Sequence, residues 1–322
     1  MDALRELSVR EQVALLFVVL FGLLALATIV AVARSLRELT AEQAAVRERF
    51  TRDLRAVWAG TVLFWIAWVS GPLGSTLLFG LVSFVALREF VTLTHTRRAD
   101  HRSLLLAFFV VLPLQYVLVG MRLANAFTVF IPVYVFFAIP VISALANDPF
   151  HFLERTAKIQ WGITVTVYGM SHAPALLLLD LPRYRERGAF LLLFLVAVVA
   201  AAQLGQEAAT RRLRRRPVAR AISRSFSWRA FGIGAGAAAL VGLLLSWTTP
   251  FTPLAATAMA AIAGAAGTFG EFVMKALKRD AGVRSWSGAS SVTGAVGLLD
   301  RVAPLCFAAP VFFHSVRGYF GI

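Results

Sequence analysis

The sequence predicts an all-α, polytopic integral membrane protein with about ten transmembrane helices. Hydrophobic residues make up 59% of its 322 residues and charged residues only 15%, whereas soluble domains average about 45–50% and about 25%. Several apolar runs approach the roughly 20 residues that a helix needs to cross a bilayer. The expected spans are residues 12–33, 57–71, 75–93, 104–118, 126–145, 159–179, 188–206, 230–247, 254–270 and 302–318.

The basic residues predict how these spans are oriented. The net charge is +15, and most Lys and Arg residues fall in alternate connections between the expected spans. Because basic loops tend to stay cytoplasmic, we expect these connections in the cytoplasm and both termini outside, in a bacterial inner membrane. The charge then serves anionic lipid headgroups rather than nucleic acid. The basic connections are residues 34–56, 94–103, 146–158, 207–229 and 271–301.

The chain is expected to have two regions. Residues 1–185 would form N-terminal transmembrane helices with a charged, amphipathic, cytoplasmic stretch at 34–56. Residues 186–322 would form a C-terminal transmembrane region. The single cysteine, Cys306, lies in an apolar run, which excludes a disulfide framework and a cysteine-based metal site.

The segment from residue 270 to 301 is unusually polar for this chain. Glu271 and Asp300 offer carboxylates for a metal, and Lys278, Arg279 and Arg301 offer cations for phosphate groups. Nucleotidyl transfer needs both kinds of side chain, together with glycines that let the backbone approach closely. A lone basic pair at the start of a loop is more often a membrane-edge anchor, so these residues alone leave both interpretations open.

At these residues the sequence resembles the bacterial phosphatidate cytidylyltransferase (CDP-diacylglycerol synthase) family. Three parts of the family's C-terminal signature follow in order: Gly270-Glu271, Lys278-Arg279-Asp280-Ala-Gly-Val283 and Leu299-Asp300-Arg301-Val302. The resemblance implies a membrane enzyme that makes CDP-diacylglycerol from CTP and phosphatidate with a divalent metal such as Mg²⁺. It also implies a homodimer, and a phosphate-binding role for Ser223, Lys278, Arg279 and Arg301.

The sequence departs from the signature where the family has polar side chains. Ser285 and Ala303 stand at aspartate positions, and the family's Pro-Gly-His-Gly-Gly is Thr293-Gly-Ala-Val-Gly297 here. In an upstream Ser-Pro-x-Lys-Thr-x-Glu-Gly pattern, Ser223 is kept, but Phe226 and Arg229 replace the lysine and the glutamate.

These departures predict an impaired site. Losing one electrostatic element of a transition-state clamp costs about 3–4 kcal/mol, so we expect a lipid-binding pseudoenzyme or scaffold in phospholipid metabolism. Glu271 and Asp300 remain as weak catalytic and metal-binding candidates, and Mg²⁺ is expected to bind weakly or not at all. The first alternative is an active cytidylyltransferase whose metal site is rebuilt from Glu207, Glu271, Asp280 and Asp300. The second is a lipid or ion translocator.

His172 is an ionisable residue within an expected span, which by default indicates a functional role. A buried imidazole that is paired with a neighbouring hydroxyl beside Pro174 is at least as good an interpretation. The adjacent charges Arg88 and Glu89, near the end of another expected span, more often anchor a helix or bind another one than perform chemistry.

Overall fold

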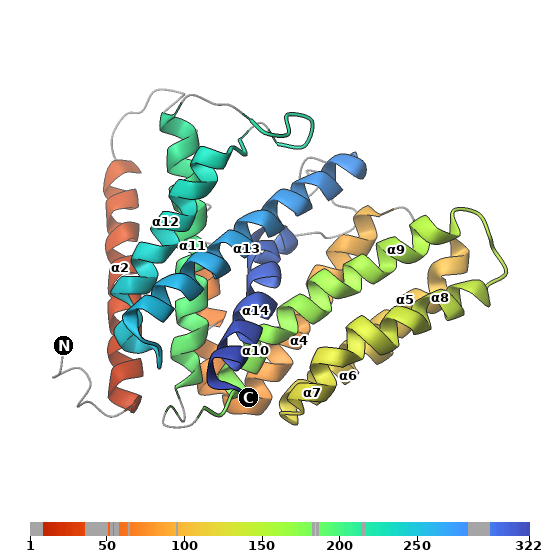
Figure 1. Ribbon diagram of the computed structural model, residues 1–322, viewed down its shortest axis with the longest axis horizontal. Coiled ribbons are helices and arrows are strands. Elements are labelled where there is room, and N and C mark those ends of the chain that lie inside the picture. The colour runs from red at the N-terminus through yellow and green to blue at the C-terminus, as the bar shows by residue number, and fades with distance from the viewer. Residues whose placement is uncertain are drawn as a thin grey trace. The chain divides into compact units, whose positions relative to one another are not determined.

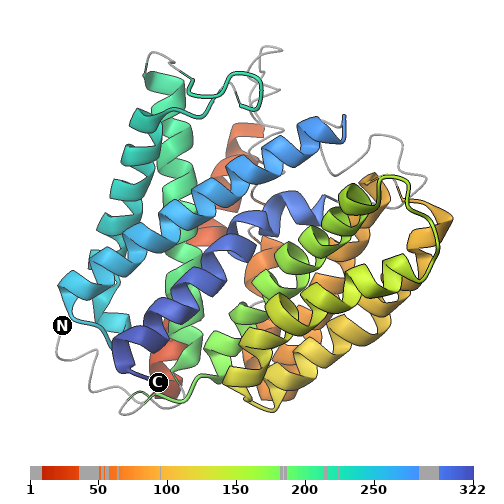
Figure 2. The same ribbon diagram turned by 45° about the vertical axis from the view of Figure 1, so that its right-hand side comes forward.

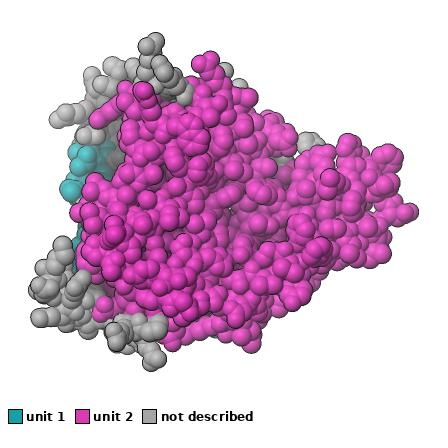
Figure 3. Space-filling model, viewed as in Figure 1, with its two compact units in different colours: residues 1–78 teal, residues 79–322 magenta. Residues whose placement is uncertain are grey.

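The computed structural model describes residues 9–35, 51, 54, 58–63, 65–94, 96–181, 184, 187–213, 217–223, 225–282 and 297–322. Within these residues all regular secondary structure is helical. The chain divides into two compact units, residues 1–78 and 79–322 (Figure 3). The division near residue 185 rests on the resemblance and stays a prediction, and nearly all of the stretch 34–56 lies outside the described residues.

Unit 1 contains α2 (Val9–Ser35), a second helical stretch at residues 58–63 and 65–69, and the first turns of α4 (Gly71–Leu93). Aromatic rings join α2 to the second stretch, with Phe17 against Trp68 and Phe21 against Trp58. The Trp58 indole N–H also donates to the Thr28 hydroxyl at 3.0 Å. These contacts pair the two stretches as an antiparallel hairpin.

Unit 2 begins within α4 and contains three long helical rods, Arg98–Gly120, Ala124–Ala144 and Phe152–Leu178. Four further helices follow, and neighbours in the chain pack against one another, with α11 also against α13 (Figures 1 and 2). Their bounds are α11 (Gly188–Arg212), α12 (Trp228–Leu244), α13 (Pro253–Asp280) and α14 (Leu298–Phe320).

Each expected span coincides with a helix in the described part of the chain. Five helices are long and apolar enough to cross a membrane, so the prediction of a helical membrane protein is confirmed, whereas the count of ten spans is not. The helix ends that adjoin the basic connections at 94–103, 146–158, 207–229 and 271–301 lie at one end of unit 2 (Figure 1). That this end is cytoplasmic stays a prediction. The five helices are Gly71–Thr92, Arg98–Gly120, Ala124–Ala144, Gly188–Arg212 and Pro253–Asp280.

Treating residues 271–301 as a loop was wrong at both ends. Helix α13 continues to Asp280, and α14 already begins at Leu298. The last turns of α13 contain good helix formers and a Glu271–Lys275 pair four residues apart, which stabilises a helix beyond its apolar part. Helix propensity therefore extended α13 past the point where its apolar run ends.

Each of the three rods contains a π-helical segment. These are η2 (Ala107–Val111), η3 (Phe130–Val135) and η4 (Thr164–Gly169). A proline lies within or shortly after each segment and removes one backbone N–H from the helix ladder. In η4 the backbone also approaches α14 closely, since a Cβ atom at Gly169 would lie 2.3 Å from the carbonyl oxygen of Cys306.

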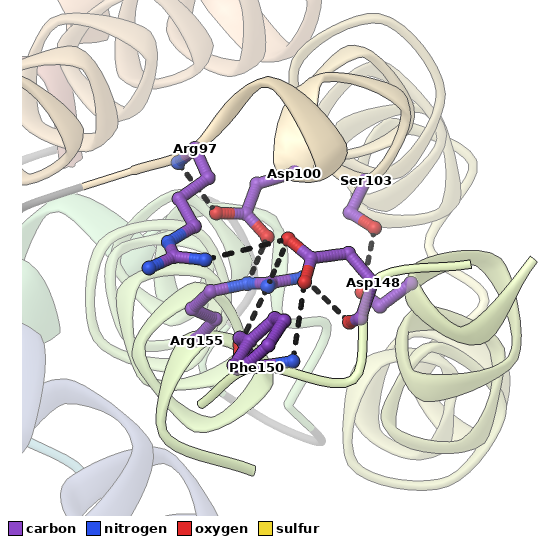
Figure 4. A network of polar contacts seen from close by, with 7 residues as sticks. Arg97, Asp100, Ser103, Asp148, Phe150 and Arg155 are labelled. Carbon is purple, nitrogen blue, oxygen red and sulfur yellow. Dashed lines mark hydrogen bonds and ion pairs between the residues drawn. The ribbon is translucent and has the colours of Figure 1, made fainter. Parts of the chain in front are cut away.

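A buried ion network holds the rods together at the end that carries the basic connections (Figure 4). Arg155, in the first turn of α9 (Phe152–Ile163), donates through Nε to Asp100 Oδ1 at 2.8 Å and through Nη1 to Asp148 Oδ2 at 2.7 Å. The Arg155 and Asp100 side chains are only 5% and 2% exposed. Arg97 donates its backbone N–H to Asp100, and its guanidinium lies 3.7 Å from Asp148. We call these four residues the Arg155 network.

Replacing Arg155 by Met should lower the free energy of unfolding by about 3–5 kcal/mol, because the Asp100 carboxylate would stay buried without its cation. Lys158→Ala is the matched control, since Lys158 pairs with the half-exposed Glu154 one turn away and should cost about 0.5 kcal/mol or less. Unfolding of the detergent-solubilised protein would be followed by tryptophan fluorescence. Equal losses in the two variants would contradict the role given to the network.

The network also predicts a pH dependence. The backbone N–H of Phe150 holds the pKa of Asp148 below its usual value, and the Arg155 and Arg97 guanidinium groups add to this against the opposing effect of burial. A depressed pKa in the folded state gives stability that is complete above the ordinary carboxyl pKa of about 3.9 and is lost as the pH falls through the folded value. Asp148→Asn should therefore be less stable at pH 7 and lose less stability on acidification. Parallel pH profiles for the two proteins would contradict this.

Candidate functional site

The polar segment is bounded by two glycines with left-handed backbone. Gly282, with φ 71°, follows the last turn of α13, and Gly297, with φ 76°, precedes the first turn of α14. Only glycine adopts this conformation without strain, which explains glycine at both helix ends. Residues 283–296 lie outside the described part of the chain, and their sequence contains no Asp, Glu, His or Cys.

Lys278 and Asp300 meet between these two helices. Lys278 lies in the last turn of α13 and Asp300 in the first turn of α14. The Lys278 ammonium Nζ lies 2.5 Å from Asp300 Oδ1, and the two side chains are 16% and 28% exposed. The structure thus joins two predicted site residues that are 22 positions apart in the sequence.

Glu271 does not join this pair. Its carboxylate binds Lys275, on the next turn of the same helix, at 2.6 Å. Glu271 and Lys278 are seven residues apart on α13, so their Cα atoms are separated by about 10 Å along the helix axis. The two predicted metal-binding carboxylates, Glu271 and Asp300, are therefore each engaged by a different lysine.

Arg279 and Arg301 add exposed positive charge beside the Lys278–Asp300 pair. Each is the next residue in the chain after one member of the pair, and their helix ends lie at the same end of unit 2 (Figure 1). This arrangement places three cations and three carboxylates, Asp280, Asp300 and Glu89, where α13 ends and α14 begins.

Ser223 closes a tight turn before α12. Its hydroxyl oxygen accepts from the backbone N–H groups of Ser225 and Phe226 at 3.3 and 3.2 Å. The Phe226 ring stacks on Phe272 of α13 with centroids 4.4 Å apart, which brings the turn against the helix that carries Glu271. Phe226 stands where the family pattern has a lysine, so an aromatic contact takes the place of a cation at this position.

His172 lies elsewhere, in α10 (Met170–Leu178). It is fully buried, its Nδ1 lies 2.7 Å from the Tyr168 carbonyl oxygen, and its Nε2 has no hydrogen-bond partner among the described residues. Its ring packs on Phe313 of α14, which is 13 residues, or about 20 Å, along that helix from Asp300. The structure does not bring His172 to the Lys278–Asp300 pair, and its partner is a carbonyl rather than the expected hydroxyl.

The described carboxylates do not assemble a metal site. Glu207 pairs with Arg211 at 2.6 Å on the exposed side of α11, and Asp280 is exposed at the end of α13. Within the described residues no group of three His, Cys, Asp or Glu side chains could hold a metal ion. This donor set does not fit Mg²⁺ well, because Asp300 is engaged by Lys278 and the neighbouring Glu89 carboxylate is engaged by two backbone N–H groups.

Glu89 is a site residue that the sequence did not reveal. It lies in α4, is 2% exposed, and accepts from the backbone N–H groups of Leu298 and Leu299 at 3.2 and 2.8 Å. These groups belong to the first turn of α14, directly before Asp300. The expectation that this charged pair on α4 would bind another helix is confirmed for Glu89. The only signal in the sequence was an acidic residue inside an apolar helix.

These features define a polytopic helical membrane protein with a cluster of charged side chains between its last two helices. The model of the cytidylyltransferase family matches residues 50–319. An Escherichia coli (strain K12) protein, named Uncharacterized protein YnbB, is 34% identical over 269 residues, which cover 81% of this chain and 85% of that protein. The chain belongs to the cytidylyltransferase family, so the resemblance seen in the signature is confirmed.

A double-mutant cycle tests the Lys278–Asp300 contact. We expect Lys278→Met and Asp300→Asn each to lower the free energy of unfolding by about 1–3 kcal/mol, with a coupling energy above about 0.5 kcal/mol. The Glu271–Lys275 pair is more exposed and local to one helix, so the same cycle there should give about 0.3–0.5 kcal/mol. Chemical unfolding in mild detergent measures both cycles. A coupling at Lys278–Asp300 no larger than in the local pair would contradict this geometry.

Proposed function

We propose that the protein is a CDP-diacylglycerol synthase-like membrane protein that binds a phosphatidate-like phospholipid and transfers cytidylyl groups poorly or not at all. The observation that carries the proposal is the Lys278–Asp300 ion pair. It unites a cation and a carboxylate from two parts of the family signature at the junction of α13 and α14.

The basic side chains of Lys278, Arg279 and Arg301 at this junction are suited to a phosphate ligand. A phosphate monoester carries between one and two negative charges near neutral pH. Lys278 is a point charge whose ammonium could exchange the Asp300 carboxylate for a phosphate oxygen. Exposed Arg279 and Arg301 are suited to the remaining oxygens, since a guanidinium binds phosphate with two parallel hydrogen bonds.

The same geometry argues against efficient transfer. A paired-metal mechanism needs carboxylates shared between two ions roughly 4 Å apart. Here Glu271 and Asp300 are each bound to a different lysine. Without a metal clamp the developing charge on the phosphates would be opposed by side-chain cations alone. CTP binding and the homodimer implied by the family stay predictions.

The test combines turnover with lipid retention. Purified protein would be incubated with radiolabelled CTP, phosphatidate and Mg²⁺, alongside an active cytidylyltransferase as a positive control. Retention would be measured as the amount of phosphatidate, relative to phosphatidylcholine, that copurifies with the protein from detergent micelles containing both lipids. We expect CDP-diacylglycerol formation at least about 100-fold below the positive control, the factor expected for one lost electrostatic element, and selective retention of phosphatidate.

Three variants distinguish the possible outcomes of this test. Lys278→Met should lower phosphatidate retention about tenfold or more, because it removes a charge-assisted contact, whereas Lys275→Met should leave it unchanged. Turnover close to that of the positive control, if it disappears in Asp300→Ala, would overturn the interpretation of an impaired site. It would favour an active enzyme with a rearranged site. Absence of both turnover and selective retention would overturn lipid binding and leave a structural or transport role.

A further inference from the structure

We propose that Glu89 is a positioning residue for the phosphate site: its buried carboxylate fixes the first turn of α14 and thereby holds Asp300 against Lys278. This inference rests on the proposed function for its ligand, but the contact it describes can be tested without any lipid. It assigns a role in the site to α4, a helix more than 200 residues away in the sequence.

The hydrogen bonds of Glu89 are specific in number and direction. One carboxylate oxygen accepts from the Leu298 N–H at 3.2 Å and the other from the Leu299 N–H at 2.8 Å. The first four N–H groups of any helix have no partner within that helix. Gly297, the residue before the first turn, has no side chain that could cap them. Glu89 therefore supplies from another helix the cap that the local sequence of α14 does not provide.

This cap fixes Asp300 through the backbone. Leu299 is fully buried, and its N–H is bound to Glu89, so the turn that carries Asp300 is held at the residue immediately before it. The negative carboxylate of Glu89 also lies at the positive end of the α14 dipole, which favours this arrangement. Lys278 then meets Asp300 at a defined distance instead of across a mobile helix end.

The cap also decides which groups remain for a phosphate. Free N–H groups at a helix N-terminus form a ready anion site. At α14 two of these four donors are taken by Glu89. A lipid phosphate would therefore meet the remaining N–H groups of this turn together with the side chains of Lys278, Arg279 and Arg301.

The reactivity of the Lys278 amine reports on its contact with Asp300. It can be measured at this one residue because the chain has lysines only at positions 158, 275 and 278. Labelling with an amine-reactive acyl ester, read by mass spectrometry, would compare Lys278 with Lys275. Lys275 is the internal reference, since its partner Glu271 lies on the same helix and owes nothing to Glu89. Asp300→Asn provides the positive control, because it removes a partner of Lys278 directly.

We expect Glu89→Gln to raise the Lys278 to Lys275 labelling ratio about fivefold, the factor for loss of one half-buried ion pair. A glutamine offers one acceptor oxygen for two N–H donors and carries no charge. Glu89→Asp keeps the charge and both oxygens and should recover part of the wild-type ratio. Ser83→Ala is the matched control, since Ser83 is a buried residue of α4 that bonds the Thr166 carbonyl instead of α14.

Each outcome decides the matter. An unchanged ratio in Glu89→Gln, or an equal rise in Ser83→Ala, overturns the positioning role whether or not the protein binds lipid. A raised ratio with a matching loss of phosphatidate retention supports it in full. A raised ratio with undiminished retention overturns the link to the phosphate site. Failure of the wild-type protein to retain phosphatidate overturns both the proposed function and the link between Glu89 and the phosphate site. The labelling ratio still decides whether Glu89 holds Lys278 and Asp300 in contact.

Discussion

The constraint on which this structure depends is that backbone N–H and C=O groups have no water to bind in the hydrocarbon of a membrane. Helices satisfy these groups everywhere except at their ends, so the ends are where polar side chains are required. Thr252 caps α13 with its own hydroxyl, and Glu89 caps α14 from another helix. The Arg155 network likewise gathers around the start of α9. These three polar contacts of unit 2 lie at helix ends for this reason, whereas others, such as that of Gln115 with Ser171, join helix interiors.

The position and type of the helices could be predicted because an apolar run of membrane length has few alternative structures. Their lengths could not. The end of the apolar run at residue 270 indicated where α13 leaves the hydrophobic layer, but the helix persists to Asp280 because its polar turns are good helix formers with an internal ion pair. Hydropathy indicates whether a segment lies in lipid or in water, whereas backbone structure follows local helix propensity. At a membrane surface the apolar run and the helix can therefore end at different residues.

The site shows the same limit. Lys278 and Asp300 could be proposed as residues of one site because both belong to an ordered signature, and the structure shows that they form an ion pair. Glu271 belongs to the same signature but is engaged by Lys275, a local contact that the signature does not encode. The sequence indicated that Glu89 anchors a helix or binds another one, but not which one, because its partners are backbone amides 209 and 210 residues further along and nearly every residue carries an amide. Arg155 and Asp100 lie in two of the expected basic connections, where charged residues are usually solvated, so nothing in the sequence indicated their buried contact.

The π-helical segments η2, η3 and η4 each add one residue to the rod that contains them. A π turn bonds residue i to i+5, so it accommodates one more residue than an α turn and shifts the faces presented by everything that follows. In three successive rods, the residues before and after the segment therefore meet their neighbours in different registers. Relatives that lack such a segment should be one residue shorter at that position, and the flanking helices should otherwise match. A single-residue gap in an alignment at that position would then mark a change of helix type. It would not mark a change in loop length.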